Sequence, residues 1–203
     1  TMVLTGASRG IGHATVKRFS EEGWRMITCS REAVPDACKR DPNWSAHIPT
    51  DLSDTKSVAA FVEEAMAVLD GDPLHALINN AAVSPKTSFK ERLGCLNGGI
   101  DAWREVFELN LFTPLELCRG FAAALSRGAK SGGASIVNIT SIAGHEIHPF
   151  AGSAYSTSKA ALSALTREMA VEFATLGVRV NAVAPGEIET EMIGEEYEPL
   201  INR

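Results

Sequence analysis

Short apolar runs along the chain alternate with longer segments in which apolar residues recur every three or four positions. The runs Ala76–Ile78 and Ile136–Ile139 are nearly continuous in apolar residues, which is typical of strands buried on both faces of a parallel sheet. The pattern predicts strands over Met2–Thr5, Arg25–Cys29, Ser45–Pro49, Ala76–Asn79, Ser135–Ile139 and Arg179–Val183.

Helical patterns fill the intervals between these strands. They cover Gly10–Glu22, Ser53–Leu69, Asp101–Ser126 and Ser153–Leu176. We expect Ser53 to be the N-cap of its helix, and Pro114 either to kink the long third helix or to be absorbed locally. The strand–helix alternation predicts right-handed crossovers in an α/β fold of the Rossmann type. This fold is a doubly wound parallel sheet with helices on both faces, here in a single domain over residues 1–203.

Composition narrows the class of protein. The 203 residues are 45% hydrophobic, enough for the core of one domain. The formal net charge is −6 and there is no block of Lys or Arg, which argues against nucleic acid or an anionic membrane as partner. No apolar run approaches the ~20 residues of a membrane-spanning helix. The cysteines lack CxxC spacing, so we expect free thiols, no metal site and a reducing cytoplasm; they are Cys29, Cys38, Cys95 and Cys118.

A glycine-rich turn joins the first predicted strand to the first predicted helix, with the spacing Gly-x-x-x-Gly-x-Gly. A helix N-terminus offers backbone N–H groups and a positive dipole end, and glycine lets a pyrophosphate approach closely. The alternative is an ordinary tight β–α turn. The spacing is neither Gly-x-Gly-x-x-Gly nor a P-loop. The candidate dinucleotide-binding residues are Gly6, Ser8, Arg9, Gly10, Ile11 and Gly12.

The end of the second strand bears on the choice of cofactor. NAD sites usually carry Asp or Glu about twenty residues after the glycine turn, whereas Ser30 and Arg31 stand here. A guanidinium attracts a 2′-phosphate, and Arg9 can approach the same group, so the sequence predicts NADP(H). Solvated surface arginines are the alternative, and a small register shift would bring Glu32 to the ribose. Asp51, which precedes Leu52, could contact adenine or cap the next helix.

A tyrosine and a lysine four residues apart, Tyr155 and Lys159, lie at the start of the last long helix, and Ser141 ends the fifth strand. This spacing puts both side chains on one helix face. A nearby ammonium favours the phenolate and lowers a tyrosine pKa, so the pair can exchange a proton with a substrate oxygen. Such pairs also arise by chance, but the chain has only two tyrosines and this one follows a dinucleotide turn.

Taken together, these motifs resemble the short-chain dehydrogenase/reductase family in its shorter, NADP-preferring form. The match runs in the family's order through nearly the whole chain. It consists of Thr5–Gly12, Asp51, Asn79–Ala82, Asn110, Ser141, Tyr155 with Lys159, and Pro185–Thr190. Ala82 stands where the family usually has glycine. The resemblance also implies several dozen further residues beyond Thr190, so the C-terminal part of the fold would be missing from this chain.

The resemblance implies a role for each matched residue. Tyr155 would be the general acid in reduction, Lys159 would lower its pKa and bind the nicotinamide ribose, and Ser141 would orient the carbonyl. Asn110 would hold a water that relays protons to Lys159; a buried structural amide is the alternative. Asn79 and Ala81 would line the adenosine side. The nicotinamide end would be formed by Pro185, Gly186, Ile188 and Thr190.

The activity implied is reduction of a ketone or 3-oxoacyl group with the pro-S hydride of NADPH. An NADP-linked alcohol or sugar dehydrogenase is the variant within the same class. A dinucleotide-binding sensor without turnover is the alternative from another class. Broadly apolar faces on both long helices, together with the family's habit, predict a homotetramer or homodimer.

Overall fold

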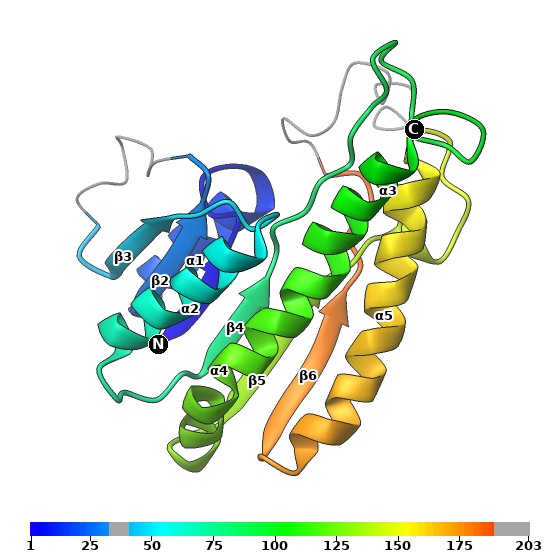
Figure 1. Ribbon diagram of the computed structural model, residues 1–203. Coiled ribbons are helices and arrows are strands. Elements are labelled where there is room, and N and C mark those ends of the chain that lie inside the picture. Colours follow the sequence, from blue (N-terminus) through cyan, green and yellow to red (C-terminus); the bar gives the residue numbers. More distant parts are fainter. Residues whose placement is uncertain (33–40, 189–203) are drawn as a thin grey trace.

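The computed structural model describes residues 1–32 and 41–188 and contains one six-stranded parallel sheet (Figure 1). The strand order is β3-β2-β1-β4-β5-β6, so the order reverses between β1 and β4, the switch point at which doubly wound sheets bind ligands. The predicted strands are confirmed, each to within one residue at either end. They are β1 (Met2–Thr5), β2 (Met26–Ser30), β3 (Trp44–Pro49), β4 (Ala76–Asn79), β5 (Ala134–Ile139) and β6 (Val178–Val183).

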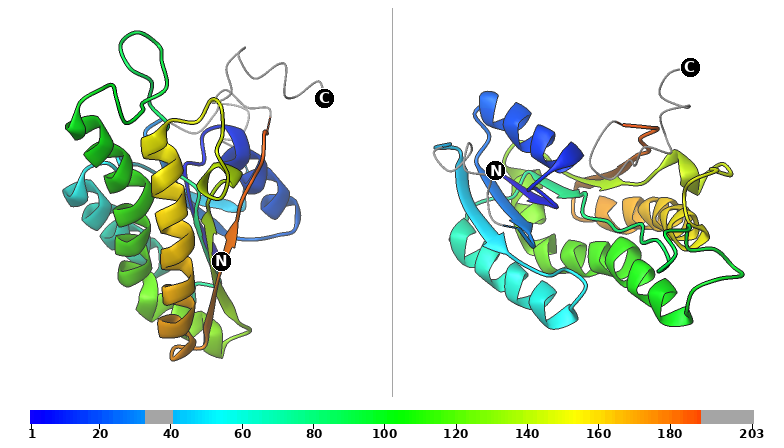
Figure 2. Two further views of the ribbon diagram at one scale, coloured as in Figure 1. Left: turned by 90° about the vertical axis from the view of Figure 1, so that its right-hand side faces the viewer. Right: turned by 90° about the horizontal axis from the view of Figure 1, so that it is seen from above.

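Helices cover both faces of the sheet, as predicted (Figure 2). They are α1 (Gly10–Glu21), α2 (Thr55–Leu69), α3 (Ile100–Phe107), α4 (Thr113–Lys130) and α5 (Ser153–Ala174). The larger core packs α2, α4 and α5 on one face, where Phe61 and Phe121 meet edge to face with 6.1 Å between ring centroids. A smaller core joins α1 to the other face through Val16 and Leu4.

The long helical segment predicted over Asp101–Ser126 is confirmed, but it is not α-helical throughout. It consists of α3, a π-helix η2 (Glu108–Phe112) and α4 in direct succession, with Pro114 in the first turn of α4. Proline has no N–H, so it cannot donate to the carbonyl four residues earlier, that of Asn110. The wider π turn accommodates this break, and no simple kink forms.

The predicted N-cap at Ser53 was wrong. Helix α2 begins one residue later, because the extended Asp54 accepts hydrogen bonds from the backbone N–H of Ser57 at 2.9 Å and from its hydroxyl at 2.7 Å. Ser53 instead donates from its N–H and its hydroxyl to Asp51, at 3.0 and 2.7 Å. Asp51 therefore closes a local turn and does not cap the helix.

The carboxyl ends of the strands and the long β4–α3 connection lie at one edge of the sheet (Figure 1). That connection contains only an isolated antiparallel bridge between Lys86 and Arg92, and it lines the cavity described below, as expected of a functional loop. Within residues 1–32 and 41–188, no helix has the length and apolar character to cross a membrane.

Candidate active site

The turn between β1 and α1 is shaped by its glycines. Gly6 has φ +69°, a left-handed conformation that favours glycine, and a Cβ on Gly12 would lie 2.1 Å from the Gly6 carbonyl oxygen. No side chain caps the N-terminus of α1. The turn therefore presents a helix N-terminus with little side-chain cover, and these features fit a bound pyrophosphate.

Asn80 holds this turn against the end of β4. Its amide nitrogen donates to the carbonyl oxygens of Thr5 and Gly6, at 2.9 and 3.1 Å. The side-chain oxygen of Thr5 in turn accepts from the backbone N–H groups of Asn80 and Ala81. The sequence analysis gave Asn80 no role of its own. The Asn-Asn pair directly after a strand was the available signal.

Ser30 and Arg31 lie at the far end of the same cavity, where β2 ends. The Ser30 side chain donates to the carbonyl oxygen of Glu32 at 2.6 Å. Asp51 borders the cavity too, and the hydrogen bonds from Ser53 lower its pKa. Glu32 borders the cavity as well, so residues of both charges line this end.

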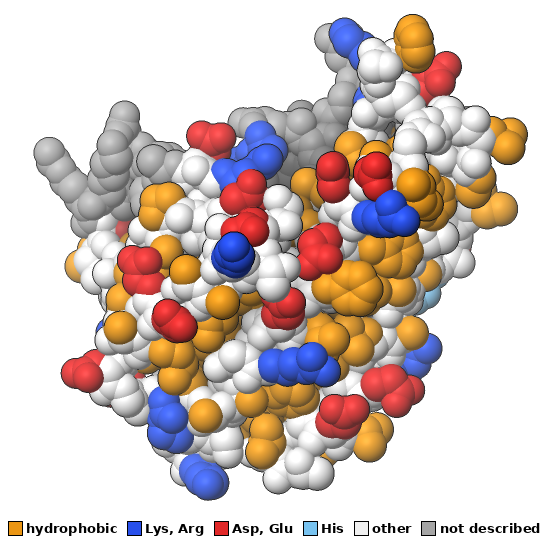
Figure 3. All heavy atoms as spheres, in the orientation of Figure 1, with side chains coloured by type: hydrophobic (Ala, Val, Ile, Leu, Met, Phe, Trp, Pro, Cys, Tyr) orange, Lys and Arg blue, Asp and Glu red, His pale blue; other side chains and the backbone are white. Residues whose placement is uncertain are grey.

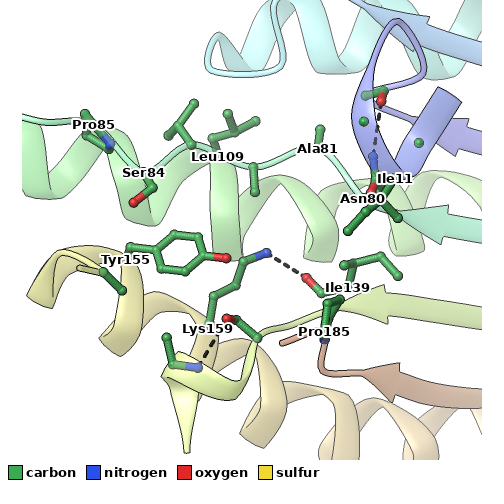
Figure 4. A pocket seen from close by; sticks show the side chains of 18 of the residues that line it. Ile11, Asn80, Ala81, Ser84, Pro85, Leu109, Ile139, Tyr155, Lys159 and Pro185 are labelled. Atoms are coloured by element: carbon green, nitrogen blue, oxygen red, sulfur yellow. Dashed lines mark hydrogen bonds between the residues drawn. The ribbon is translucent and has the colours of Figure 1, made fainter. Parts of the chain in front are cut away.

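The predicted acid–base group comes together at the end of β5. The Lys159 Nζ atom lies 5.8 Å from the centre of the Tyr155 ring and donates to the carbonyl oxygen of Ile139 at 2.6 Å. Ser141 hydrogen-bonds the Tyr155 hydroxyl and also accepts from the N–H of Ala143. Figure 4 shows Tyr155 and Lys159 side by side in the cavity, across from Ser84 and Leu109.

The electrostatics of this group differ from the prediction. Burial raises the Tyr155 pKa above its ordinary value, and the Ser141 hydrogen bond opposes this only in part. Burial also lowers the Lys159 pKa to about 8. Desolvation of the phenol is thus the largest influence on the Tyr155 pKa in this geometry, and the lowering of that pKa by Lys159 stays a prediction.

Asn110 is fully buried in η2 and does not line the cavity. Its amide oxygen accepts from the N–H of Val83, and its amide nitrogen donates to the Val83 carbonyl and to Ser158, at 2.9 to 3.1 Å. Ser158 in turn donates to the carbonyl of Tyr155 at 2.7 Å. Asn110 thus ties the chain after β4 to the helix that carries Tyr155. The water relay stays a prediction.

Asn79 also lies outside the cavity. Its amide is buried beneath the end of the sheet, where it donates to Asn138 at 2.8 Å and to the Cys118 sulfur at 3.5 Å. Cys118, like Cys29 and Cys95, is a free thiol, and Cys38 lies outside the described residues. Ala81, the other residue expected on the adenosine side, does border the cavity.

The turn after β6 closes the nicotinamide end. Pro185, Gly186 and Ile188 border the cavity as predicted, and Thr190 lies outside the described residues. Glu187 accepts a hydrogen bond from His148, a contact that lowers the Glu187 pKa. The sequence analysis missed His148, because nothing local marks a histidine that pairs with a residue 39 positions away.

One cavity of about 670 Å³ unites these parts, a volume suited to a cofactor and a small substrate. The predicted residues that line it are Gly6, Ser8, Arg9, Gly10, Ile11, Gly12, Ser30, Arg31, Asp51, Leu52, Ala81, Ser141, Tyr155, Lys159, Pro185, Gly186 and Ile188. In the described part of the chain, no three His, Cys, Asp or Glu residues are grouped so as to hold a metal ion.

Comparison with known proteins agrees with this geometry. The short chain dehydrogenase family profile matches residues 1–200. The chain is 51% identical over 201 residues to Protein FixR of Bradyrhizobium diazoefficiens, covering 98% of this chain and 71% of that protein. It is 36% identical over 196 residues to cis-4-hydroxycyclohexanecarboxylate dehydrogenase of Sinomonas cyclohexanicum, covering 94% and 74%.

Two solved structures illustrate cofactor binding among relatives. A Brucella ovis oxidoreductase in complex with partially ordered NAD is 50% identical, with a TM-score of 0.85 over 93% of this chain and 83% of that one. The Pseudomonas aeruginosa RhlG/NADP active-site complex is 28% identical, with a TM-score of 0.83 over 100% and 76%. Related structures therefore bind either NAD or NADP.

Proposed function

The chain belongs to the short chain dehydrogenase family of oxidoreductases, and on that premise we propose that it transfers a hydride between NADP(H) and a small carbonyl compound or alcohol. The observation that carries the proposal is the convergence of Ser141, Tyr155 and Lys159 on the cavity that also borders the glycine turn. A pure binding module has no need of that acid–base group.

Each residue has a defined task in the reduction of a ketone or 3-oxoacyl group. The nicotinamide, when bound, supplies the hydride to the carbonyl carbon. Tyr155 donates its phenolic proton to the carbonyl oxygen, and its raised pKa keeps that proton available across neutral pH. The Ser141 hydroxyl, already bonded to Tyr155, orients the same oxygen, and the Lys159 ammonium favours the phenolate that proton transfer leaves behind.

Preference for NADP(H) is the finer part of the proposal. Ser30 stands where a carboxylate would repel a 2′-phosphate, and Arg31 and Arg9 border the same cavity. The competing feature is Glu32, which also borders it, and the Brucella ovis relative was crystallised with NAD. Two arginines against one carboxylate favour the phosphorylated cofactor.

Two alternatives have support among the relatives. Galactitol 2-dehydrogenase of Cereibacter sphaeroides is 35% identical over 195 residues, which favours an alcohol or sugar dehydrogenase running in the oxidative direction. The name Protein FixR states no reaction, which keeps a non-catalytic dinucleotide-binding sensor as the alternative from another class.

The test compares the full protein with its Tyr155→Phe variant. NADPH and NADH oxidation would be followed with ketones and 3-oxoacyl thioesters, and NADP⁺ reduction with polyols. We expect higher kcat/KM with NADPH, and a loss of about 10²–10⁴-fold in kcat for Tyr155→Phe, the usual contribution of a general acid. NADPH affinity should be unchanged in the variant. Equal activity in the two proteins would eliminate the catalytic assignment, and absence of turnover with intact NADPH binding would favour the sensor.

A further inference from the structure

A histidine outside the cavity holds the turn that faces the cofactor ribose. His47 lies on β3 and is paired in register with Thr28 of β2, and it does not border the cavity. Its Nε2 atom lies 2.8 Å from the Glu32 carbonyl oxygen and 3.1 Å from the Ser30 hydroxyl. Its Nδ1 atom lies 2.9 Å from the Thr28 hydroxyl. Both ring nitrogens are thus engaged.

The partners decide where the ring hydrogen sits. A carbonyl oxygen only accepts, so the Nε2 atom that faces Glu32 carries the hydrogen. The Thr28 hydroxyl accepts from the Trp44 indole N–H and has one hydrogen of its own to give. Its distance to His47 Nδ1 is shorter than the 3.4 Å to the Ala46 carbonyl, so it donates to His47. The network therefore selects the tautomer that carries its hydrogen on Nε2.

The Glu32 carbonyl consequently receives two hydrogen bonds, one from Ser30 at 2.6 Å and one from His47 at 2.8 Å. These two donors fasten the backbone of residues 30–32 to the sheet. Arg31 and Glu32, whose charges would act on a 2′-phosphate in the proposed function, lie on this turn and border the cavity. A turn held at a single point would leave both side chains free to shift.

We propose that His47 is a positioning residue for cofactor selectivity, acting through its Nε2–H on the Glu32 carbonyl. The inference rests on the proposed function, since it assumes that the ribose lies at this end of the cavity. It goes beyond that function because it concerns a residue that does not border the cavity.

Two substitutions separate the ring nitrogens. A glutamine places its amide nitrogen near the position of Nε2, whereas an asparagine reaches only near Nδ1. The affinities of 2′,5′-ADP and 5′-ADP would be measured by calorimetry on the full protein, without turnover. We expect His47→Asn to reduce the wild-type affinity ratio about three- to tenfold, the range set by one hydrogen bond. The His47→Gln variant should keep the ratio within about twofold. The kcat at saturating cofactor should not change in either variant.

The outcomes are distinguishable. An unchanged ratio in a folded His47→Asn variant overturns the positioning role and leaves the proposed function intact. A wild-type protein that binds neither nucleotide, or binds both equally, overturns both proposals. A preference for 5′-ADP that His47→Asn alone abolishes supports the positioning role and corrects the cofactor to NAD.

A measurement on the wild-type protein covers the case in which His47→Asn fails to fold. Nitrogen-15 NMR distinguishes the tautomers of a histidine ring, and the His47→Gln spectrum assigns the signal. We expect the Nε2–H form at neutral pH. An Nδ1–H form would overturn the inference, because the Glu32 carbonyl would then lack its predicted donor.

Discussion

At the scale of single residues, the costliest feature of the site is the burial of Lys159. The side chain is only 2% exposed, and its ammonium donates a hydrogen bond to the Ile139 carbonyl. Burial disfavours the charged form and lowers the pKa from 10.5 to about 8. An apolar side chain at this core position would not carry that desolvation cost.

We therefore expect Lys159→Met to inactivate the enzyme and to stabilise the fold at neutral pH. At neutral pH the lysine is charged in both states, and the shift from 10.5 to about 8 corresponds to at most roughly 3 kcal/mol. Between those pKa values the unfolded state binds more protons than the folded one, so wild-type stability rises with pH. Urea denaturation of both proteins should show that the difference between their free energies of unfolding shrinks as pH rises from about 7 to about 10.5.

The control for this prediction is the variant itself, whose position 159 does not titrate. If the difference in free energy of unfolding stayed constant over the whole pH range, burial of the Lys159 ammonium would not destabilise the fold as argued. A variant less stable than wild type at neutral pH would mean that the bond to Ile139 outweighs desolvation.

The residues that the sequence predicted differ in kind from those it missed. Tyr155 and Lys159 were predictable because a helix fixes their relative placement from four positions of sequence. His47 and His148 were not, because each acts through a partner that only the sheet order or a loop brings close, Glu32 and Glu187. The sign of the Tyr155 pKa shift was missed for a related reason, since burial is a property of the whole fold.

At the scale of elements, the π-helix η2 is what the sequence pattern could not reveal. The apolar residues of Asp101–Ser126 keep a helical period throughout, so periodicity alone predicts one helix. Pro114 marks a missing backbone hydrogen bond, but the form that the helix takes there depends on the segment that packs against it. In this fold that segment is the chain after β4, which Asn110 holds at both polar atoms of Val83.

We expect Asn110→Ala to destabilise the protein by roughly 2–4 kcal/mol, because it leaves the partly buried N–H and carbonyl of Val83 and the buried Ser158 hydroxyl without this partner. The kcat should fall as well, since the bond between the β4–α3 connection and the Tyr155 helix is lost. Denaturation in urea and steady-state kinetics would measure both effects.

Asn181→Ala is the matched control, because that asparagine is exposed on β6 and a surface change should stay within about 0.5 kcal/mol. If the two variants were equally stable, the hydrogen bonds of Asn110 would not stabilise the link between the chain after β4 and helix α5.

At the scale of the whole molecule, the parallel sheet with helices on both faces followed from the alternation of strands and helices. The oligomer did not, because the same apolar helix face can pack on the chain's own sheet or on a second copy. The structure separates these faces. Leu162, Met169 and Phe173 of α5 are buried against the sheet, whereas Ala160, Ala164 and Val171 remain on its outer side.

We propose that this outer side of α5, together with Phe112, pairs with a second copy of the chain. Val171 is 73% exposed and Phe112 is 46% exposed, and Figure 3 shows hydrophobic side chains gathered over the α4 and α5 side. The small residues Ala160 and Ala164 would let two α5 helices approach closely. In a dimer with a two-fold axis, the outer side of α5 in one copy faces the outer side of α5 in the other. One substitution therefore occurs twice in each interface.

Light scattering should therefore give two or four times the 21.6 kDa of this chain, scaled to the length of the protein used. Ala164→Glu with Val171→Glu should lower the mass to that of the monomer, because the two-fold places like charges opposite each other in a dry interface. Ile147→Glu is the control, since Ile147 is 99% exposed on the loop that precedes α5 and does not belong to the outer side of that helix, and it should leave the mass unchanged. A wild-type monomer at micromolar concentration would refute the pairing, and an oligomer that survives both glutamates would move it to another surface.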